Sequence, residues 1–176
     1  MTVIAYSSKH RVMASDSRCQ DDRGNFHLTN CVKIFRLKSG AIVGQAGDGD
    51  ARDLFTLLGR ASPRKMPTRA QLAELKIDCV ALVVFPKGQL FQVTCEFFER
   101  GNGNHGMWTG EVMPIRDELA SIGSGAPYAY GAMEHGASPI QAVRAACRRD
   151  LLCALPVQWE SLDITGGLPA KRKSGT

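Results

Sequence analysis

The opening of the chain predicts a β-hairpin, and no other stretch limits the fold as strongly. An apolar, β-prone run covers residues 3–6, and a short polar turn leads into a second apolar run at residues 12–14. Two short strands joined by a tight polar connection form a hairpin. The pairing places Asp16, after the second strand, beside Thr2, before the first. A carboxylate and a hydroxyl are therefore expected side by side where the chain begins.

The later strands and helices are expected in segregated runs, which favours an α+β domain over an alternating parallel fold. Runs of β-prone residues predict strands at 26–29, 32–37, 41–44, 79–85, 89–97, 119–122 and 157–164. Apolar residues at helical spacing predict helices at about 50–59, 68–75, 127–135 and 138–155. The glycine-rich stretch 44–50 is expected to be a loop, and both hairpins before it to share one antiparallel sheet. Two antiparallel sheets flanked by helix pairs, a four-layer αββα sandwich, would bury both runs of strands.

The length of 176 residues predicts a single domain, spanning 1–168, with a flexible basic tail at 169–176. No apolar run is long enough to span a bilayer and no secretory signal pattern opens the chain, so a cytoplasmic location is expected. The six cysteines form no CxxC pair and have no histidines at ligand spacing. We expect most of them to be small buried side chains in a reducing compartment, and we expect neither a metal nor a cofactor.

The formal charge of +5 raises the question of nucleic-acid binding. The positive charge is concentrated in the tail, at 171–173, and in a basic stretch at 60–69. Neither stretch is interleaved with aromatic residues, and neither belongs to a recognisable nucleic-acid module. Solvated surface is the favoured interpretation, with neither nucleic acid nor membrane as a partner, and nucleic-acid binding stays a distant alternative.

Several sequence motifs occur in an order that resembles a known family. They are TVIAY in the opening strand, ASDSR in its partner, VKIFRL, GAIVGQAGDGDA and IGSGAPYAYGAMEHG, and the similarity continues through SPIQAVRAACRRD to about Leu155. In this order and spacing they resemble the proteasome β-subunits and the peptidase subunit of the bacterial two-component ATP-dependent protease. Both groups are N-terminal-nucleophile hydrolases, so the resemblance implies the αββα sandwich of that superfamily and threonine endopeptidase activity.

The resemblance implies a role for the first three polar residues of the site. Thr2 matches the nucleophile, exposed once Met1 is removed, with its own freed α-amine as the base. Lys33 matches the lysine whose positive charge lowers the pKa of the amine and hydroxyl, and Asp16 matches the carboxylate that pairs with this lysine.

Three further residues complete the implied catalytic set. Gly47 matches the glycine whose backbone N–H faces the developing oxyanion, where a side chain would prevent close approach. Ser124 matches a serine that assists proton transfer, and Asp150 matches the carboxylate that supports it. Local sequence also permits Ser124 to be only a helix start, and Asp150 to be an exposed charge paired with a neighbouring arginine. The residues that match the lining of the specificity pocket are Cys19, Cys31, Gln45 and Gly49.

The chain departs from the family pattern at a few positions. Val3 stands where the family often has a second threonine, and Asp48 adds a carboxylate beside the oxyanion loop. Cys153 replaces a serine that follows the helix carboxylate, which is expected to weaken the supporting hydrogen bonds. We also expect no propeptide, so that Met1 alone would cover the nucleophile during assembly.

The resemblance implies a peptidase that cleaves polypeptides inside a homo-oligomeric ring, with an ATP-dependent unfoldase as a partner to be considered. Two alternatives remain open. One is a catalytically inactive, proteasome-like assembly subunit, marked by a retained N-terminal methionine. The other is a small-molecule amidase of the same superfamily, marked by activity in a monomer or dimer.

Overall fold

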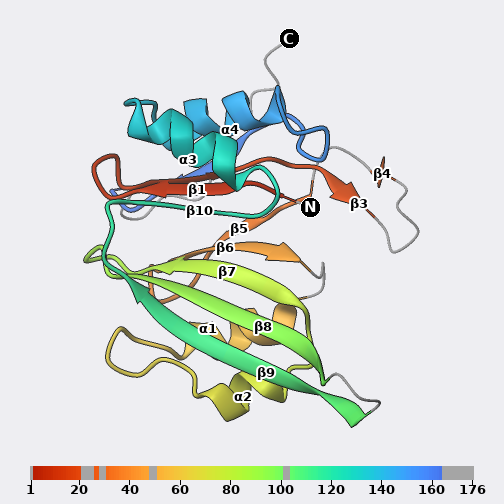
Figure 1. Cartoon of the computed structure of the whole chain (residues 1–176). Helices are drawn as coiled ribbons and strands as arrows, with labels where there is room; N and C mark the ends of the chain where they lie inside the picture. The colour runs from red at the N-terminus through yellow and green to blue at the C-terminus, as the bar shows by residue number, and fades with distance from the viewer. Residues whose placement is uncertain (1, 21–25, 28–30, 48–50, 101–103, 164–176) are drawn as a thin grey trace.

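The computed structural model describes residues 2–20, 26–27, 31–47, 51–100 and 104–163. Two antiparallel sheets face each other, and a pair of helices covers the outer face of each sheet (Figure 1). The four-layer sandwich expected from the sequence is therefore confirmed. Within the described ranges, no helix is long and apolar enough to cross a membrane.

The opening hairpin is confirmed and lies in the centre of the smaller sheet. Strands β1 (Ile4–Ser7) and β2 (Val12–Ser15) pair with each other. β10 (Leu119–Ile122) pairs along the free side of β1, and β11 (Gln158–Ser161) along the free side of β2. β11 lies at one edge of this sheet, and it falls within the strand expected at 157–164.

The larger sheet contains five strands in chain order. They are β5 (Ile34–Arg36), β6 (Ile42–Gly47), β7 (Cys79–Val84), β8 (Leu90–Arg100) and β9 (Asn104–Ile115). The expectation that both early hairpins share one sheet is wrong, because β1–β2 and β5–β6 lie in different sheets. Alternation of apolar residues shows that a strand has a buried face, but not which strand it pairs with.

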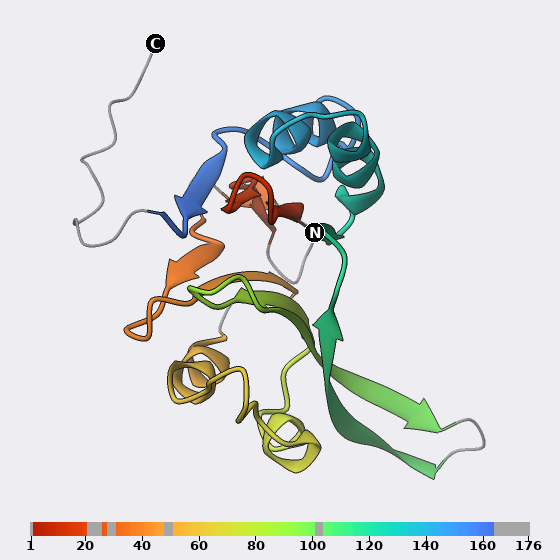
Figure 2. The same cartoon turned by 90° about the vertical axis from the view of Figure 1, so that its left-hand side faces the viewer.

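One other expectation about the strands is wrong, and one strand is absent from the predicted set. Residues 44–47 belong to β6 and not to a loop, because they pair with β7 from Leu82 to Cys79. β9 was not anticipated, since its sequence is rich in glycine and polar residues, and it is held by its pairing with β8. Figure 2 shows β8 and β9 reaching beyond the rest of the sheet. A short pair, β3 (Cys19–Gln20) and β4 (Phe26–His27), follows the first hairpin.

Capping residues set where two of the helices begin. α2 (Arg69–Ala73) starts with a capping box between Thr68 and Gln71, and α4 (Pro139–Cys147) starts with one between Ser138 and Gln141. α1 (Arg52–Gly59) has Ala51 as its N-cap, without a capping hydrogen bond from a side chain. α1 and α2 cover the larger sheet, whereas α3 (Ala126–Glu134) and α4 cover the smaller one (Figure 2).

The alternation of side chains along β1 connects the sandwich to its polar end. Ile4 and Tyr6 face the larger sheet, while Val3 and Ala5 face α3 and α4. The sheets are close at Gly44, where an added Cβ would lie 2.6 Å from the Ile4 side chain. Thr2 precedes Ile4 by two residues, so the alternation places it on the side of β1 that faces the larger sheet.

Candidate functional site

A buried ion pair joins the two sheets at the end where β1 begins. Lys33 immediately precedes β5 of the larger sheet, and Asp16 immediately follows β2 of the smaller one. Lys33 Nζ lies 2.8 Å from Asp16 Oδ1. The Asp16 residue is 0% exposed and Lys33 is 7% exposed. Water screens such a pair little, so the lysine charge acts strongly on groups nearby.

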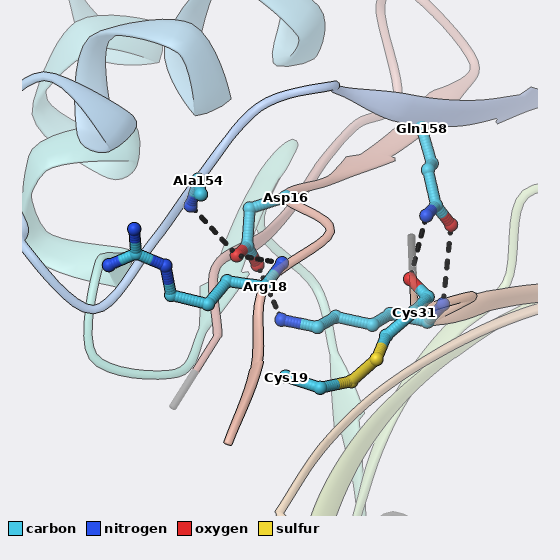
Figure 3. The surroundings of a disulfide bond; sticks show 7 residues. Asp16, Arg18, Cys19, Cys31, Ala154 and Gln158 are labelled. Carbon is cyan, nitrogen blue, oxygen red and sulfur yellow. Dashed lines mark hydrogen bonds and ion pairs between the residues drawn. A yellow bond between two sulfur atoms is a disulfide. The ribbon is translucent and has the colours of Figure 1, made fainter. Parts of the chain in front are cut away.

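Asp16 accepts hydrogen bonds from four donors, which occupy both of its oxygens. Oδ1 accepts from Val3 N–H at 3.1 Å as well as from Lys33, and Oδ2 accepts from Arg18 N–H at 3.0 Å and Ala154 N–H at 3.2 Å. Figure 3 shows Arg18 and Ala154 approaching the carboxylate from two sides. A buried carboxylate needs such partners to remain charged.

The first residues are fixed against both neighbouring strands. Asp16 N–H donates to Val3 O at 3.2 Å, which confirms that Asp16 lies beside the start of the chain. Thr2 O accepts from Gly125 N–H at 3.3 Å and from Ser124 Oγ at 3.5 Å. Gly123 has φ +91°, and a Cβ there would lie 2.1 Å from Thr2 O, so only glycine fits this turn. Thr2 itself is 3% exposed in the chain that carries Met1.

A second polar group surrounds Asp150, after α4. Asp150 Oδ1 accepts from Leu152 N–H at 2.9 Å, and Oδ2 accepts from the Cys153 thiol at 3.3 Å. Burial alone would raise the pKa of Asp150, but hydrogen bonds from Leu152 N–H, the Ser124 hydroxyl and Cys153 outweigh burial and lower it. Burial raises the pKa of the Cys153 thiol, which therefore stays protonated and donates. Asp150 and Ser124 are thus brought together, and Cys153 supplies a hydrogen bond from the place where the family has a serine.

Gly47 lies at the end of β6 in a conformation that excludes other residues. Its φ is +113°, and an added Cβ would lie 2.4 Å from Asp78 O and 2.6 Å from Cys79 Cα. The requirement for glycine thus arises partly from the close approach of β7. Gly49 and Asp48 lie outside the described residues.

Two of the residues expected in the specificity pocket form a disulfide. Cys19 and Cys31 are bonded to each other, with their Cα atoms 5.9 Å apart (Figure 3). The expectation of buried thiols is therefore wrong for this pair. The two cysteines are separated by 12 residues, and their spacing alone gives no sign that the fold brings them together. Cys79, Cys95 and Cys153 are buried free thiols as expected, and Cys147 is half-buried. Gln45 is buried on β6, and its N–H donates to Lys33 O at 3.0 Å.

Gln158, on β11, was not identified from the sequence, where a glutamine in an edge strand carries no signal. Its Nε2 donates to Cys31 O at 2.6 Å, and its Oε1 accepts from Lys33 N–H at 3.3 Å (Figure 3). Arg18 was also missed, and its guanidinium donates to Leu151 O. Gln158 thus holds the segment that carries Lys33, and Arg18 holds the segment that follows Asp150.

Two other kinds of site were sought. Among the described residues, no group of three or more His, Cys, Asp or Glu side chains could hold a metal ion. A hollow of about 630 Å³ lies away from the ion pair, at the turns that join β5 to β6 and β7 to β8. Its lining includes Ser39, Arg64, Phe85 and Lys87. None of the residues expected in the catalytic site lines it.

Comparison with known proteins shows what fold these residues occupy. The sequence matches no protein-family model and no curated protein. The structure matches the crystal structure of eukaryotic HslV from Trypanosoma brucei, with a TM-score of 0.65 over 90% of this chain and 98% of that chain. The chain has the HslV fold. At 18% sequence identity the likeness shows the fold alone. It agrees with the architecture that the sequence motifs implied.

Proposed function

We propose that this protein is a threonine peptidase of the HslV type, with the Thr2 hydroxyl as nucleophile after Met1 is removed. One observation carries the proposal: the buried Asp16–Lys33 pair, drawn from both sheets, lies where the chain begins. A buried ion pair is a weak way to stabilise a protein, because desolvation offsets much of the Coulombic attraction. A lysine charge held beside a terminal hydroxyl and amine instead has a direct chemical use.

The proposed reaction proceeds through an ester. The α-amine of Thr2 takes the hydroxyl proton as Oγ bonds to the peptide carbonyl carbon, and the charge of Lys33 lowers the pKa of both groups. The Gly47 N–H stabilises the oxyanion. The ammonium then gives its proton to the leaving nitrogen as the C–N bond breaks. In the second half the amine takes a proton from water as the water oxygen bonds to the ester carbon, and it passes this proton to Oγ as the ester C–O bond breaks and the new acid leaves.

Ser124 and Asp150 are proposed to assist proton transfer at the amine. The Ser124 hydroxyl lies within reach of both Thr2 O and the Asp150 carboxylate and donates its one proton to either of them, so it connects the chain start to the carboxylate. Because the pKa of Asp150 is lowered, the carboxylate stays ionised near neutral pH and favours a serine hydroxyl that points toward it. The Cys153 thiol supplies a further donor to this group.

The setting of the reaction also belongs to the proposal. By resemblance to ring-forming peptidases we propose polypeptide substrates, a homo-oligomeric ring, an ATP-dependent unfoldase as partner and a cytoplasmic location. Cys19, Cys31, Gln45 and Gly49 are proposed to lie near the substrate side chain that precedes the cleaved bond. Size-exclusion chromatography with light scattering tests the ring directly, because a monomer or dimer cannot enclose a chamber.

The decisive experiment combines intact mass with the variant Thr2→Ala. We expect the purified protein to lack Met1, to cleave unstructured peptides, and to gain the mass of a threonine-directed covalent inhibitor. Thr2→Ala should lose both cleavage and labelling, while Thr109→Ala, a threonine on β9 far from the site, should keep them. Retained Met1, or cleavage by Thr2→Ala at the original rate, would rule the proposal out.

The burial of Thr2 favours one other function. With Met1 attached, Thr2 is 3% exposed, so its hydroxyl cannot meet a peptide carbonyl in that form of the chain. A subunit that keeps Met1 and serves only in assembly would have this property. Such a protein would form a ring of full-length chains that no threonine-directed inhibitor labels.

A further inference from the structure

We propose that Gln158 is a positioning residue for Lys33, an assignment that rests on the proposed peptidase function. Its carboxamide bonds at both ends to the backbone of the segment that carries the lysine. Nε2 donates to Cys31 O at 2.6 Å, and Oε1 accepts from Lys33 N–H at 3.3 Å. A primary amide presents a donor and an acceptor in one plane, so this side chain substitutes for the peptide group of a neighbouring strand.

The backbone of Lys33 is held from both sheets. Its C=O accepts from Gln45 N–H on β6 at 3.0 Å, and its N–H donates to Gln158 on β11. Regular pairing between β5 and β6 starts one residue later, at Ile34. Lys33 therefore lies just outside the regular pairing of β5 with β6, and its N–H bonds to the Gln158 amide and not to a neighbouring strand.

Gln158 also connects the segment of Lys33 to the strand that carries Asp16. In the smaller sheet Gln158 pairs with Ser15, the residue that precedes Asp16. Asp16 is thus one residue away from the position in β2 that pairs with Gln158, and the Gln158 side chain bonds to Lys33 N–H. We infer that this connection sets the 2.8 Å separation of Lys33 Nζ and Asp16 Oδ1. Without it, the segment of Lys33 would keep its bond to Gln45 and the contacts at residue 31.

The contacts at residue 31 do not replace this function. Cys31 is bonded to Cys19, and its N–H donates to Ser17 O at 3.1 Å. Both contacts tie Cys31 to the segment after Asp16, but they end two residues before Lys33. The Gln158 amide spans that interval, since its two bonds are to Cys31 and to Lys33 itself.

A matched control is present on the same strand. Glu160 lies two residues after Gln158, and its carboxylate pairs with Arg36 of β5 at 2.8 Å. This contact also connects β11 with β5, but it does not involve Lys33. Glu160→Gln therefore measures what a general loosening of the two sheets does, whereas Gln158→Met removes both amide bonds at nearly the same side-chain length.

The first measurement is the acylation rate of Lys33 by acetic anhydride, read by peptide mass spectrometry on folded protein. It needs no enzymatic activity. A buried lysine bonded to a carboxylate reacts slowly, so we expect Gln158→Met to raise the rate at Lys33 at least fivefold and Glu160→Gln to leave it within twofold. Gln158→Asn, which is too short to reach both backbone groups, replaces the Met variant if that protein does not fold. An unchanged rate at Lys33, or an equal rise in both variants, would refute the positioning role.

The second measurement is the pH dependence of kcat/KM. The Thr2 amine must be neutral to act as base, and a nearby positive charge keeps its pKa below the usual value of about 8. If Lys33 shifts away, the amine pKa rises, so the acid limb should move upward by roughly half a pH unit in Gln158→Met and stay in place in Glu160→Gln. Faster acylation with an unmoved acid limb would show that Gln158 holds the lysine without tuning the reaction. A wild-type protein with no peptidase activity would contradict the proposed function, and the acylation rates would still decide whether Gln158 holds Lys33.

Discussion

Replacing Asp16 by Asn is the most direct test of the buried centre. The Asp16 residue is 0% exposed, and each of its two oxygens accepts two donors. An asparagine has one oxygen and one NH₂ group, so in either orientation two donors face a donor. Lys33 also loses its counter-charge while its side chain is only 8% exposed. Breaking one partner of a buried ion pair costs about 3–5 kcal/mol, so we expect a loss of that size in the free energy of unfolding.

Urea denaturation at pH 7 measures this loss. With an m-value on the order of 2 kcal/mol per molar, the midpoint should fall by about 2 M. The control is Asp163→Asn, because the Asp163 side chain is 61% exposed in its ion pair with Arg11 and should matter by less than about 1 kcal/mol. Asp16→Asn combined with Lys33→Met should lose less than the sum of the single changes, since no uncompensated charge remains. A loss below about 1 kcal/mol in Asp16→Asn, or strict additivity in the double variant, would show that the pair is not the buried unit described.

Three further outcomes are expected. Gly47→Ala should lower the free energy of unfolding by roughly 1–3 kcal/mol, because alanine at φ +113° is strained and its Cβ meets Asp78 O. Thermal unfolding measures this loss, with Gly59→Ala as the control because an added Cβ there has no atom within 4 Å. Since the folded state lowers the pKa of Asp150, the wild type should lose stability relative to Asp150→Asn as pH falls through and below 3.8, and denaturant melts from pH 6 to 2.5 should show it. Denatured, unreduced protein should show four free thiols, and removing the disulfide with Cys19→Ser and Cys31→Ser should cost about 3 kcal/mol for a loop of this length.

Features encoded by neighbouring residues could be predicted from the sequence. The first hairpin needs only two apolar runs and a polar turn, and the starts of α2 and α4 need only a hydroxyl and a glutamine three residues apart. The position of Asp16 beside the chain start followed from the hairpin alone. In each case the decisive contacts join residues close in the chain, so local propensity and the final fold agree.

Features that depend on distant pairing could not be predicted. β9 contains glycine and polar residues that lower its propensity, and it becomes a strand because β8 supplies a partner along its length. The Cys19–Cys31 bond and the contacts of Gln158 likewise join residues whose proximity exists only after both sheets pack. A single glutamine or cysteine carries no sign of such a partner.

The placement of the candidate site at one end of the sandwich follows from strand direction. Thr2 precedes β1 and Lys33 precedes β5, whereas Asp16 follows β2 and Gly47 ends β6. In an antiparallel pair the start of one strand lies beside the end of its partner. The hairpin β1–β2 therefore places Thr2 and Asp16 at the same end of the smaller sheet, and β5–β6 places Lys33 and Gly47 at the same end of the larger one.

Strand direction alone leaves open whether the two hairpins point the same way once their sheets are stacked. Contacts between the sheets fix that orientation, and they include the close approach of β6 to the Ile4 side chain at Gly44 and the bonds of Gln158, which connect β11 to the segment before β5. Gly44→Ala separates these contributions. A Cβ 2.6 Å from Ile4 should push the sheets apart and raise the acylation rate of Lys33, although Lys33 and its hydrogen-bonding partners are unchanged. If the rate does not change, the Gln158 and Asp16 contacts hold the lysine independently of how closely the sheets pack.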